Sequence, residues 1–179
     1  MNNSNSEKAL SERPDHELVR VKELKFCWGD KTVLDDISFT IFSGQIVAIL
    51  GKNGAGKTTL IKCLNRVQSP QNGKIEICSK DISRQSLIEL SKSVSYVPQS
   101  VRTNFSMDVF DVLLLGRRPH ISWRTSSEDL QAVSETLRKF GLEDLAFRRF
   151  DRLSGGERQR VVIAKAVVQN PRVYLLDEP

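Results

Sequence analysis

The stretch Gly51-Lys52-Asn53-Gly54-Ala55-Gly56-Lys57-Thr58 decides the fold of this chain. Two glycines with four residues between them, followed by a lysine and a hydroxyl residue, are typical of a phosphate-binding loop. The glycines let the backbone curl, so that successive N–H groups and the start of the next helix face phosphate oxygens. Lys57 then adds a cation for the β- and γ-phosphates, and Thr58 offers a hydroxyl to Mg²⁺. Such a loop is shared by ATPases, GTPases and small-molecule kinases, so further motifs must separate these classes.

The residues around this loop predict a mixed α/β protein. Residues 46–50 are continuously apolar, which predicts a central strand buried on both faces. A helix is expected from Gly56 to Asn65. Antiparallel strands are expected at residues 18–26 and 37–41, and another strand at residues 74–78 after a turn.

The middle of the chain has helical spacing instead. Apolar residues recur there at three- and four-residue steps, which predicts one buried helix face made by Leu130, Val133, Leu137 and Phe140. Thr125 with Glu128 predicts a capping box at the start of this helix, and Gly141 predicts its end. A mostly helical insert therefore separates two stretches of α/β pattern.

A second glycine-rich motif, Leu153-Ser154-Gly155-Gly156-Glu157-Arg158-Gln159-Arg160, precedes the helix-compatible residues 161–168. Its serine and its glycine amides are arranged to face a phosphate from a helix end. The alternative interpretation is an ordinary helix start with Ser154 as its N-cap.

The last apolar strand, residues 173–176, is followed by Asp177-Glu178-Pro179. We expect this strand to run beside the strand of the phosphate loop, where the Asp177 carboxylate can hold Mg²⁺. Along an extended chain Glu178 would point the other way and orient or deprotonate the attacking water. The alternative is a turn that ends a strand.

Together, and in this order, the three motifs resemble those of the ATP-binding-cassette family over residues 18–179. Two further residues fit the resemblance. Trp28 stands where the family has an aromatic that stacks on adenine, and Gln99 matches its glutamine loop; an ordinary strand-end aromatic and an exposed loop glutamine are the alternatives. The resemblance implies a P-loop NTPase fold with a RecA-like core, an antiparallel β subdomain, and a helical subdomain at about residues 100–152.

The resemblance also assigns the site residues. It implies that the nucleotide is bound by Trp28, Gly51, Asn53, Gly54, Ala55, Gly56, Lys57, Thr58, Thr59, Ser154, Gly155 and Gly156. It implies catalytic roles for Lys57, Gln99 and Glu178. It implies that Mg²⁺ is held by Thr58, Gln99 and Asp177.

The implied function is ATP hydrolysis that drives a membrane transporter, with ATP and Mg²⁺ as cofactors. The family pairs two such subunits head to tail around ATP, and it couples them to transmembrane permease subunits and, indirectly, to a substrate-binding protein. This places the chain peripherally at the cytoplasmic face of the membrane. Residues 116–120 resemble a segment of bacterial importers of metal chelates such as iron-siderophores, haem and cobalamin; a helix-end turn is the alternative, and His120 has no second metal ligand nearby.

The composition fits these expectations. With 39% apolar and 27% charged residues, the 179-residue chain is expected to form one folded domain at residues 18–179 behind a polar tail at residues 1–17. No apolar run is long enough for a transmembrane helix or a signal peptide. The charge of +5 is interspersed with acidic residues, so we expect no nucleic-acid partner. The three cysteines predict neither disulfides nor a zinc site.

The chain departs from the family at Pro179, its last residue. The family continues with a strand that ends in a catalytic histidine, and neither His16 nor His120 stands at that place. We therefore expect a truncated chain or a partial record, which hydrolyses ATP poorly or not at all. A soluble cassette ATPase without a membrane partner and a nucleotide-binding module without turnover stay open as alternatives, while the second glycine motif argues against a small-molecule kinase.

Overall fold

The computed structural model describes residues 16–99 and 106–178. All but the last two residues of the expected tail, the first six residues of the expected helical subdomain, and Pro179 lie outside the described residues. The chain divides into two compact units, residues 1–85 and 86–179. No helix in the described ranges has both the length and the apolar character needed to cross a membrane.

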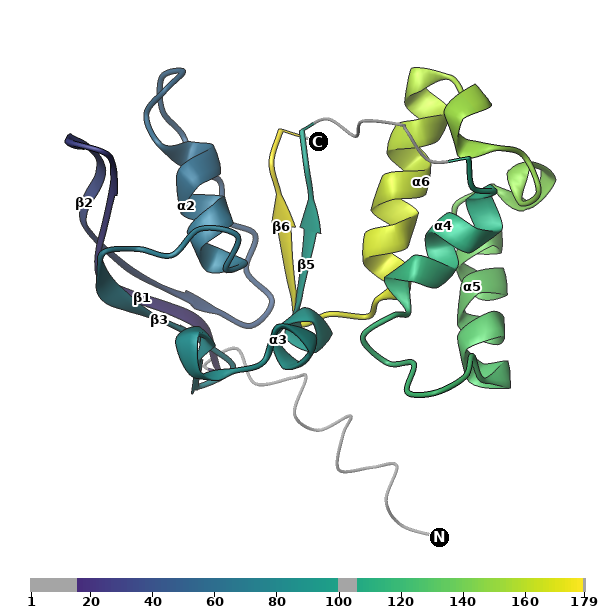
Figure 1. Ribbon diagram of the computed structural model, residues 1–179, viewed down its shortest axis with the longest axis horizontal. Coiled ribbons are helices and arrows are strands. Elements are labelled where there is room, and N and C mark those ends of the chain that lie inside the picture. The colour runs from purple at the N-terminus through teal and green to yellow at the C-terminus, as the bar shows by residue number, and fades with distance from the viewer. Residues whose placement is uncertain (1–15, 100–105, 179) are drawn as a thin grey trace, which may run out of the picture. The chain divides into compact units, whose positions relative to one another are not determined.

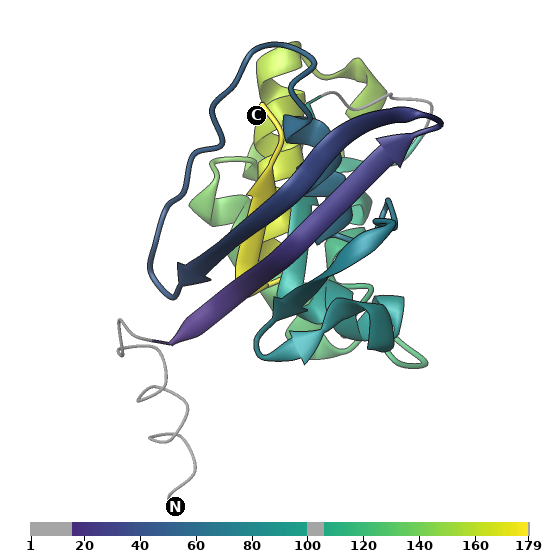
Figure 2. The same ribbon diagram turned by 90° about the vertical axis from the view of Figure 1, so that its left-hand side faces the viewer.

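The first unit contains an antiparallel sheet with the strand order β2-β1-β3-β4. Its strands are β1 (Glu17–Trp28), β2 (Lys31–Phe42), β3 (Asn72–Ile77) and β4 (Lys80–Asp81), followed by the short 3-10 helix η1 (Ile82–Arg84). Figure 2 shows β1 and β2 side by side along most of their length. Val19, Val21 and Leu24 of β1 are buried, so the strands predicted from alternation are confirmed, and β1 and β2 are longer than predicted.

The first unit has a single α-helix within the described residues, α2 (Lys57–Leu64), as predicted. Leu60, Ile61 and Leu64 bury its apolar face, together with Cys63. Burial raises the pKa of Cys63 to about 11, so this thiol stays neutral and acts as a small apolar side chain.

Residues 46–50 correct one prediction, because they form no strand. Ile46 is fully exposed and Leu50 is 90% exposed. A continuous apolar run becomes a central strand only when neighbouring strands satisfy its backbone on both edges. Within the described residues this segment pairs with no strand, so its side chains lie in solvent.

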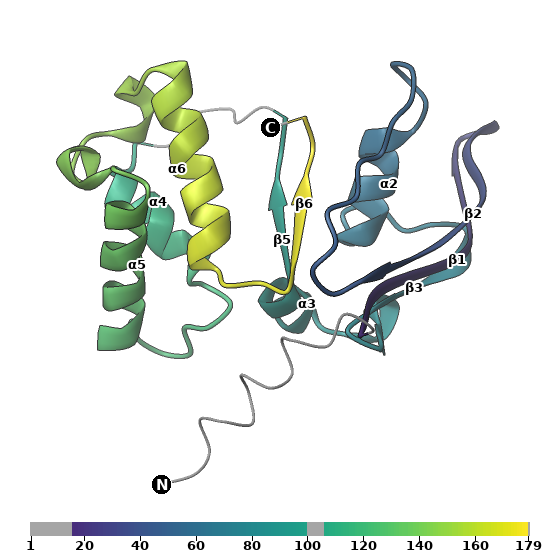
Figure 3. The same cartoon turned by 180° about the vertical axis from the view of Figure 1, so that it is seen from behind.

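The second unit begins with α3 (Leu87–Ser93) and β5 (Val94–Val97) and ends with β6 (Val173–Leu176). Between these strands lie α4 (Val109–Gly116), α5 (Ser127–Lys139), the 3-10 helices η2 (Glu143–Leu145) and η3 (Phe150–Arg152), and α6 (Gly155–Val168). β5 and β6 form a parallel pair, and α4, α5 and α6 pack against one another (Figures 1 and 3). The predicted strand at residues 173–176 and the helical insert are thus confirmed.

Residues 116–120 hold the three helices together. Gly116 ends α4 against α6, where an added Cβ would lie 2.5 Å from the Lys165 carbonyl oxygen. The Arg117 side chain is partly buried. Its Nε donates to Asp129 of α5 at 3.0 Å, and its Nη1 donates to the Val168 carbonyl of α6 at 3.1 Å. His120 Nε2 lies 2.8 Å from the Gln169 carbonyl oxygen. The helix-end turn that was left open therefore describes this segment, with a packing role.

The start of α5 differs from its prediction by one residue. Ser126 and Asp129 form the capping box, instead of Thr125 and Glu128. The shift turns Asp129 inward, where it pairs with Arg117, and leaves Leu130 42% exposed, although it was predicted to be buried. The predicted end is confirmed, because Gly141 follows the helix with a left-handed φ of 59°.

Candidate nucleotide-binding site

The phosphate loop passes into α2 through glycines with left-handed backbones. Gly54 and Gly56 have φ of 80° and 94°, which residues with side chains rarely adopt. Gly56 is the N-cap of α2, no side chain caps this helix, and its first turn contains no acidic residue. The first turn of α2 therefore places no carboxylate at the positive end of the helix dipole, where a carboxylate would repel a phosphate.

Lys57 bends back over the loop that precedes it. Its Nζ donates to the carbonyl oxygens of Gly51 at 3.0 Å and Lys52 at 3.3 Å. The loop is tight, because an added Cβ on Gly51 would lie 3.3 Å from the Cβ of Ala55. The ammonium group is therefore held at the loop to which sequence reasoning assigned the β- and γ-phosphates.

Trp28, the residue proposed to stack on adenine, ends β1 with its side chain 54% exposed. Its ring contacts Phe26 edge to face, with ring centroids 5.1 Å apart. Gly56 links α2 to β2, since an added Cβ would lie 3.0 Å from side-chain atoms of both Val33 and Leu34. The turn after Trp28 and the phosphate loop lie at the same end of the first unit (Figures 1 and 2).

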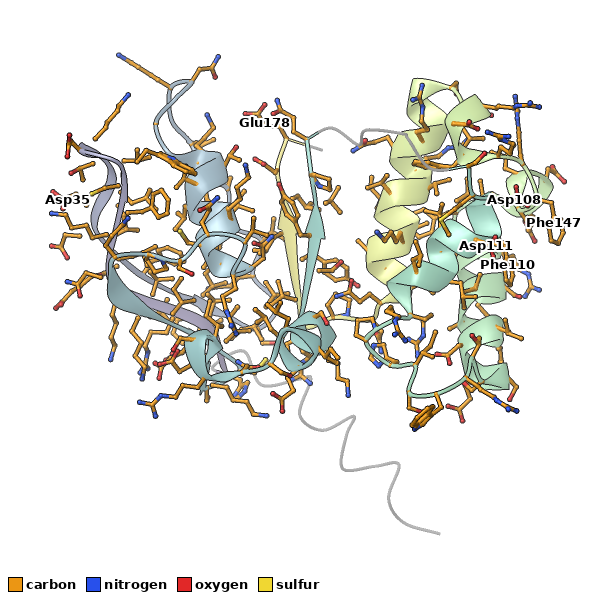
Figure 4. All side chains as sticks on the ribbon, in the orientation of Figure 1. Asp35, Asp108, Phe110, Asp111, Phe147 and Glu178 are labelled. Carbon is orange, nitrogen blue, oxygen red and sulfur yellow. The ribbon has the colours of Figure 1, made fainter. Side chains whose placement is uncertain are left out.

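In the second unit, the carboxyl ends of β5 and β6 bring Gln99 together with the two acids. Val97 pairs with Leu176, so the residues that follow both strands lie at one edge. Gln99 Nε2 donates to Glu178 Oε2 at 2.6 Å. Figure 4 shows Glu178 at this end of β6. Asp177 is only 4% exposed, and its backbone N–H donates to the Val97 carbonyl at 3.0 Å.

The expected alternation of the two acids along an extended chain is wrong in its geometry. Glu178 has a left-handed φ of 49°, so the chain is not extended at this residue. Asp177 accepts a hydrogen bond from Tyr96, and Glu178 accepts one from Gln99.

Tyr96 is the residue that sequence reasoning did not find. Its hydroxyl donates to Asp177 Oδ2 at 3.1 Å. Burial, and then the Asp177 carboxylate, raise the pKa of Tyr96 to about 12, so the hydroxyl stays protonated at neutral pH. The available signal was its place in a short apolar strand, three residues before Gln99, where a polar ring end needs a partner.

The second glycine motif starts α6 with Ser154 as N-cap, as the helix-start interpretation predicted. Ser154 Oγ accepts a hydrogen bond from the Glu157 N–H at 3.3 Å, and Glu157 Oε2 accepts one from the Ser154 N–H at 2.7 Å. Hydrogen bonds from the Ser154 N–H and then from the Ser154 hydroxyl hold the pKa of the Glu157 carboxyl below its usual value. The box thus resembles those of Ser86 and Ser126, whose hydroxyls donate to the acids of their own boxes.

The side chains proposed for Mg²⁺ offer the donor atoms that this ion prefers. Thr58 provides a hydroxyl, Gln99 an amide oxygen and Asp177 a carboxylate. The described residues contain no cluster of three or more His, Cys, Asp or Glu that could hold a metal by itself. Each of these donors, taken by itself, is of the kind that Mg²⁺ accepts beside phosphate oxygens and water.

Known proteins resemble this chain in sequence and in fold. The sequence profile of the ABC transporter family matches residues 34–179. An uncharacterized ABC transporter ATP-binding protein of Methanocaldococcus jannaschii is 45% identical over 162 residues, covering 90% of this chain and 63% of that protein. The hemin import ATP-binding protein of Thermobifida fusca is 34% identical, with 90% and 57% covered.

The solved structures agree. A structure described as a metal-chelate type ABC transporter in an inward-facing conformation matches with a TM-score of 0.75 and 33% identity, covering 90% of this chain and 59% of that one. The structure of cbiO1 from Clostridium perfringens, described as part of the ABC transporter complex cbiONQ, matches with a TM-score of 0.78 and 31% identity, covering 92% of this chain and 66% of that one. The chain spans about three fifths of the length of the curated relatives it matches. By sequence and by fold, the chain belongs to the ATP-binding-cassette transporter family.

Proposed function

We propose that this chain is the ATP-binding and ATP-hydrolysing part of the motor subunit of an ABC transporter. One observation carries the proposal: the N-terminus of α2 has no capping side chain and no acid in its first turn, and Lys57 is folded over the loop before it. Backbone amides and a cation at one helix start are the chemistry that recognises phosphate.

Each proposed site residue has a chemical task. Amides of the loop and Lys57 bind the phosphates and stabilise charge that grows on the γ-phosphoryl oxygens. Glu178 orients the attacking water and accepts its proton once its bond to Gln99 is released. Mg²⁺, when bound, supplies charge neutralisation between phosphate oxygens. Asp177, Thr58 and Gln99 are the residues proposed to hold it.

Nucleotide binding tests this proposal directly. A fluorescent ATP analogue should bind the chain, and Lys57→Ala should weaken that binding by about 10- to 100-fold, the range expected for losing a charge-assisted hydrogen bond. Lys62→Ala removes the same charge from the last turn of α2 and should leave binding unchanged. Equal affinities for the unsubstituted chain and Lys57→Ala would refute the assignment of the site.

We also propose that two copies of the subunit pair head to tail, and the start of α6 supports this arrangement. Ser154 places a hydroxyl at the N-terminus of α6, where a hydroxyl donor and the helix dipole favour a phosphate. Gly155 and Gly156 leave room for a close approach, because an added Cβ would meet nothing within 4 Å at either residue. Light scattering with ATP should then detect dimers in the full-length Glu178→Gln variant, and monomers alone would contradict the arrangement.

A groove on the helical part supports contact with a permease. It encloses about 470 Å³ and is lined by Met107, Asp111, Leu114, Leu115, Arg118, Ile121, Trp123, Arg124 and Thr125. Trp123 is 98% exposed, and neither arginine forms an ion pair within the described part of the chain. Phe110 and Phe147 stack near Asp111 at the start of α4 (Figure 4). An apolar floor beside two cations fits an apolar cytoplasmic segment that carries an acidic residue.

Co-purification with the permease in detergent tests this surface. Leu115→Glu places a charge in the groove and should abolish co-purification, while binding of the ATP analogue is retained. Leu87→Glu is the matched control, since Leu87 is an exposed leucine of α3 in the same unit. Loss of the complex in both variants, or in neither, would contradict the proposed contact.

For the cargo we propose a metal chelate. The support comes from relatives named for hemin import and from the metal-chelate type transporter. The packing role of residues 116–120 explains that segment without reference to cargo. Uptake of radiolabelled iron chelates by cells with and without the full-length protein tests the proposal, and unchanged uptake would remove it.

A further inference from the structure

In β5, a residue to which the motifs assign no role forms a hydrogen bond with Asp177, the acid that we propose as a Mg²⁺ ligand. Tyr96 pairs with Leu175 in the register of the parallel strands, one position from the strand end, and its hydroxyl donates to Asp177 Oδ2 at 3.1 Å. Both residues belong to the second unit. The hydrogen bond therefore joins two strand ends within one compact part of the chain.

This hydrogen bond restrains the side-chain torsions of Asp177, which a fixed backbone still leaves adjustable. The backbone of Asp177 is already fixed, since its N–H donates to the Val97 carbonyl at 3.0 Å. The side chain is 4% exposed, so bulk water contributes little to its orientation. A terminal carboxylate torsion is broad by nature, and a hydroxyl donor on one oxygen narrows it. The second oxygen is thereby given a defined direction.

We propose that Tyr96 is a positioning residue for Mg²⁺, which orients the Asp177 carboxylate before the metal and nucleotide bind. The inference rests on the proposed function, because it takes Asp177 as a metal ligand. Partners that hydrogen-bond to metal-ligating carboxylates typically change metal affinity by about 10- to 100-fold when they are removed. In this role Tyr96 acts through the Asp177 carboxylate, to which its hydroxyl donates.

The test separates metal-dependent from metal-independent nucleotide binding. The affinity of a fluorescent ATP analogue is measured with Mg²⁺ and with EDTA, and the ratio of the two gives the gain due to metal. Tyr96→Phe keeps the ring and removes the hydroxyl. It should lower the Mg²⁺-dependent gain by about 10-fold and leave affinity in EDTA unchanged.

Tyr174→Phe is the matched control. It removes a tyrosine hydroxyl from the adjacent strand β6, and Tyr174 makes no side-chain hydrogen bond among the described residues. This variant should keep the full gain due to Mg²⁺. Far-UV circular dichroism of both variants reports whether the β5–β6 pair still folds.

A double substitution tests whether Tyr96 changes the Mg²⁺-dependent gain through Asp177. In an Asp177→Asn background, adding Tyr96→Phe should change the Mg²⁺-dependent gain no further, since the two groups act as one unit. Additive losses would overturn the positioning role, and so would a full gain in Tyr96→Phe alone. If the unsubstituted chain bound no nucleotide even in EDTA, the proposed function would fall, and the inference with it.

Discussion

Helix α2 begins at Gly56, which has no side chain to offer as a cap, whereas α6 begins at Ser154, which forms a capping box with Glu157. Both starts belong to glycine-rich motifs, and each motif by its sequence predicts a segment that faces a phosphate. In the structure, α2 has no acid in its first turn and Lys57 folded beside it, while α6 has an acid accepting from its N-cap amide. The same helix dipole thus meets a cation in one place and a carboxylate in the other.

This difference suggests that the two helix starts contact a nucleotide in different ways. The start of α2 has a glycine as its N-cap and no acid in its first turn, which suits a helix end that receives a phosphate. The start of α6 is capped without a ligand, by the reciprocal bonds of Ser154 and Glu157. We infer that α2 supplies most of the binding energy for phosphate, and that α6 adds a contact to a nucleotide already bound.

The largest expected difference in stability is between an alanine substitution at the start of α2 and one at the start of α6. Gly56→Ala forces a side chain onto a φ of 94° and brings its Cβ within 3.1 Å of the Val33 carbonyl oxygen. We expect a loss of about 1–3 kcal/mol in the free energy of unfolding, measured by urea denaturation, together with weaker binding of the ATP analogue.

Gly155→Ala is the counterpart in α6. Its added Cβ meets nothing within 4 Å, and Gly155 occupies the first helical position without a left-handed backbone. Alanine favours a helix over glycine by up to about 1 kcal/mol, so this change should be neutral or stabilising. Equal losses for the two alanines would show that the two starts are built alike.

A medium effect is expected from removing the cap of α6. Ser154→Ala deletes the oxygen that accepts from the Glu157 N–H and should cost about 1 kcal/mol of stability. Ser154→Gly should cost only a few tenths of a kcal/mol, roughly, because glycine leaves the N-cap amides open to water. Urea denaturation of both variants measures this difference, and an alanine that costs no more than the glycine would argue against the cap.

Local sequence patterns predicted what local physics determines. The strands β1 to β3, the helix α2 and the serine cap of α6 depend on side-chain alternation, glycine backbones and short-range hydrogen bonds, and all are present. The hydrogen bond from Gln99 to Glu178 was not predicted, because it joins residues that are 79 positions apart in the sequence. The assignment of these residues to nucleotide and metal stays a prediction.

What the sequence could not predict depends on neighbours distant along the chain. The apolar run at residues 46–50 has the composition of a buried strand. A central strand also needs hydrogen bonds to a neighbouring strand on each edge, and within the described residues this run pairs with no strand. The cap of α5 shifted by one residue because Asp129 pairs with Arg117, a contact between two helices. Tyr96 was overlooked since its partner, Asp177, lies on a strand far along the chain.

The smallest expected effect is a pH response confined to α6. The pKa of Glu157 is held below its usual value by hydrogen bonds from Ser154. The stabilisation is therefore present above the unfolded pKa of about 4.3 and is lost as the pH falls through the lower folded value. The first turn of α2 contains no acid, so it lacks this response.

Hydrogen exchange, corrected for intrinsic rates, measures this contrast between pH 7 and acid. Protection at residues 154–160 should fall by a few-fold as the Glu157 carboxylate is protonated, while protection at residues 57–62 should follow only the unfolding of its own unit. Glu157→Gln keeps the side-chain shape but removes the titrating group, so it should flatten the response of α6. If the response persisted in Glu157→Gln, the acid sensitivity would originate outside the capping box, and the contrast between the two helix starts would rest on Lys57 and the glycine backbone alone.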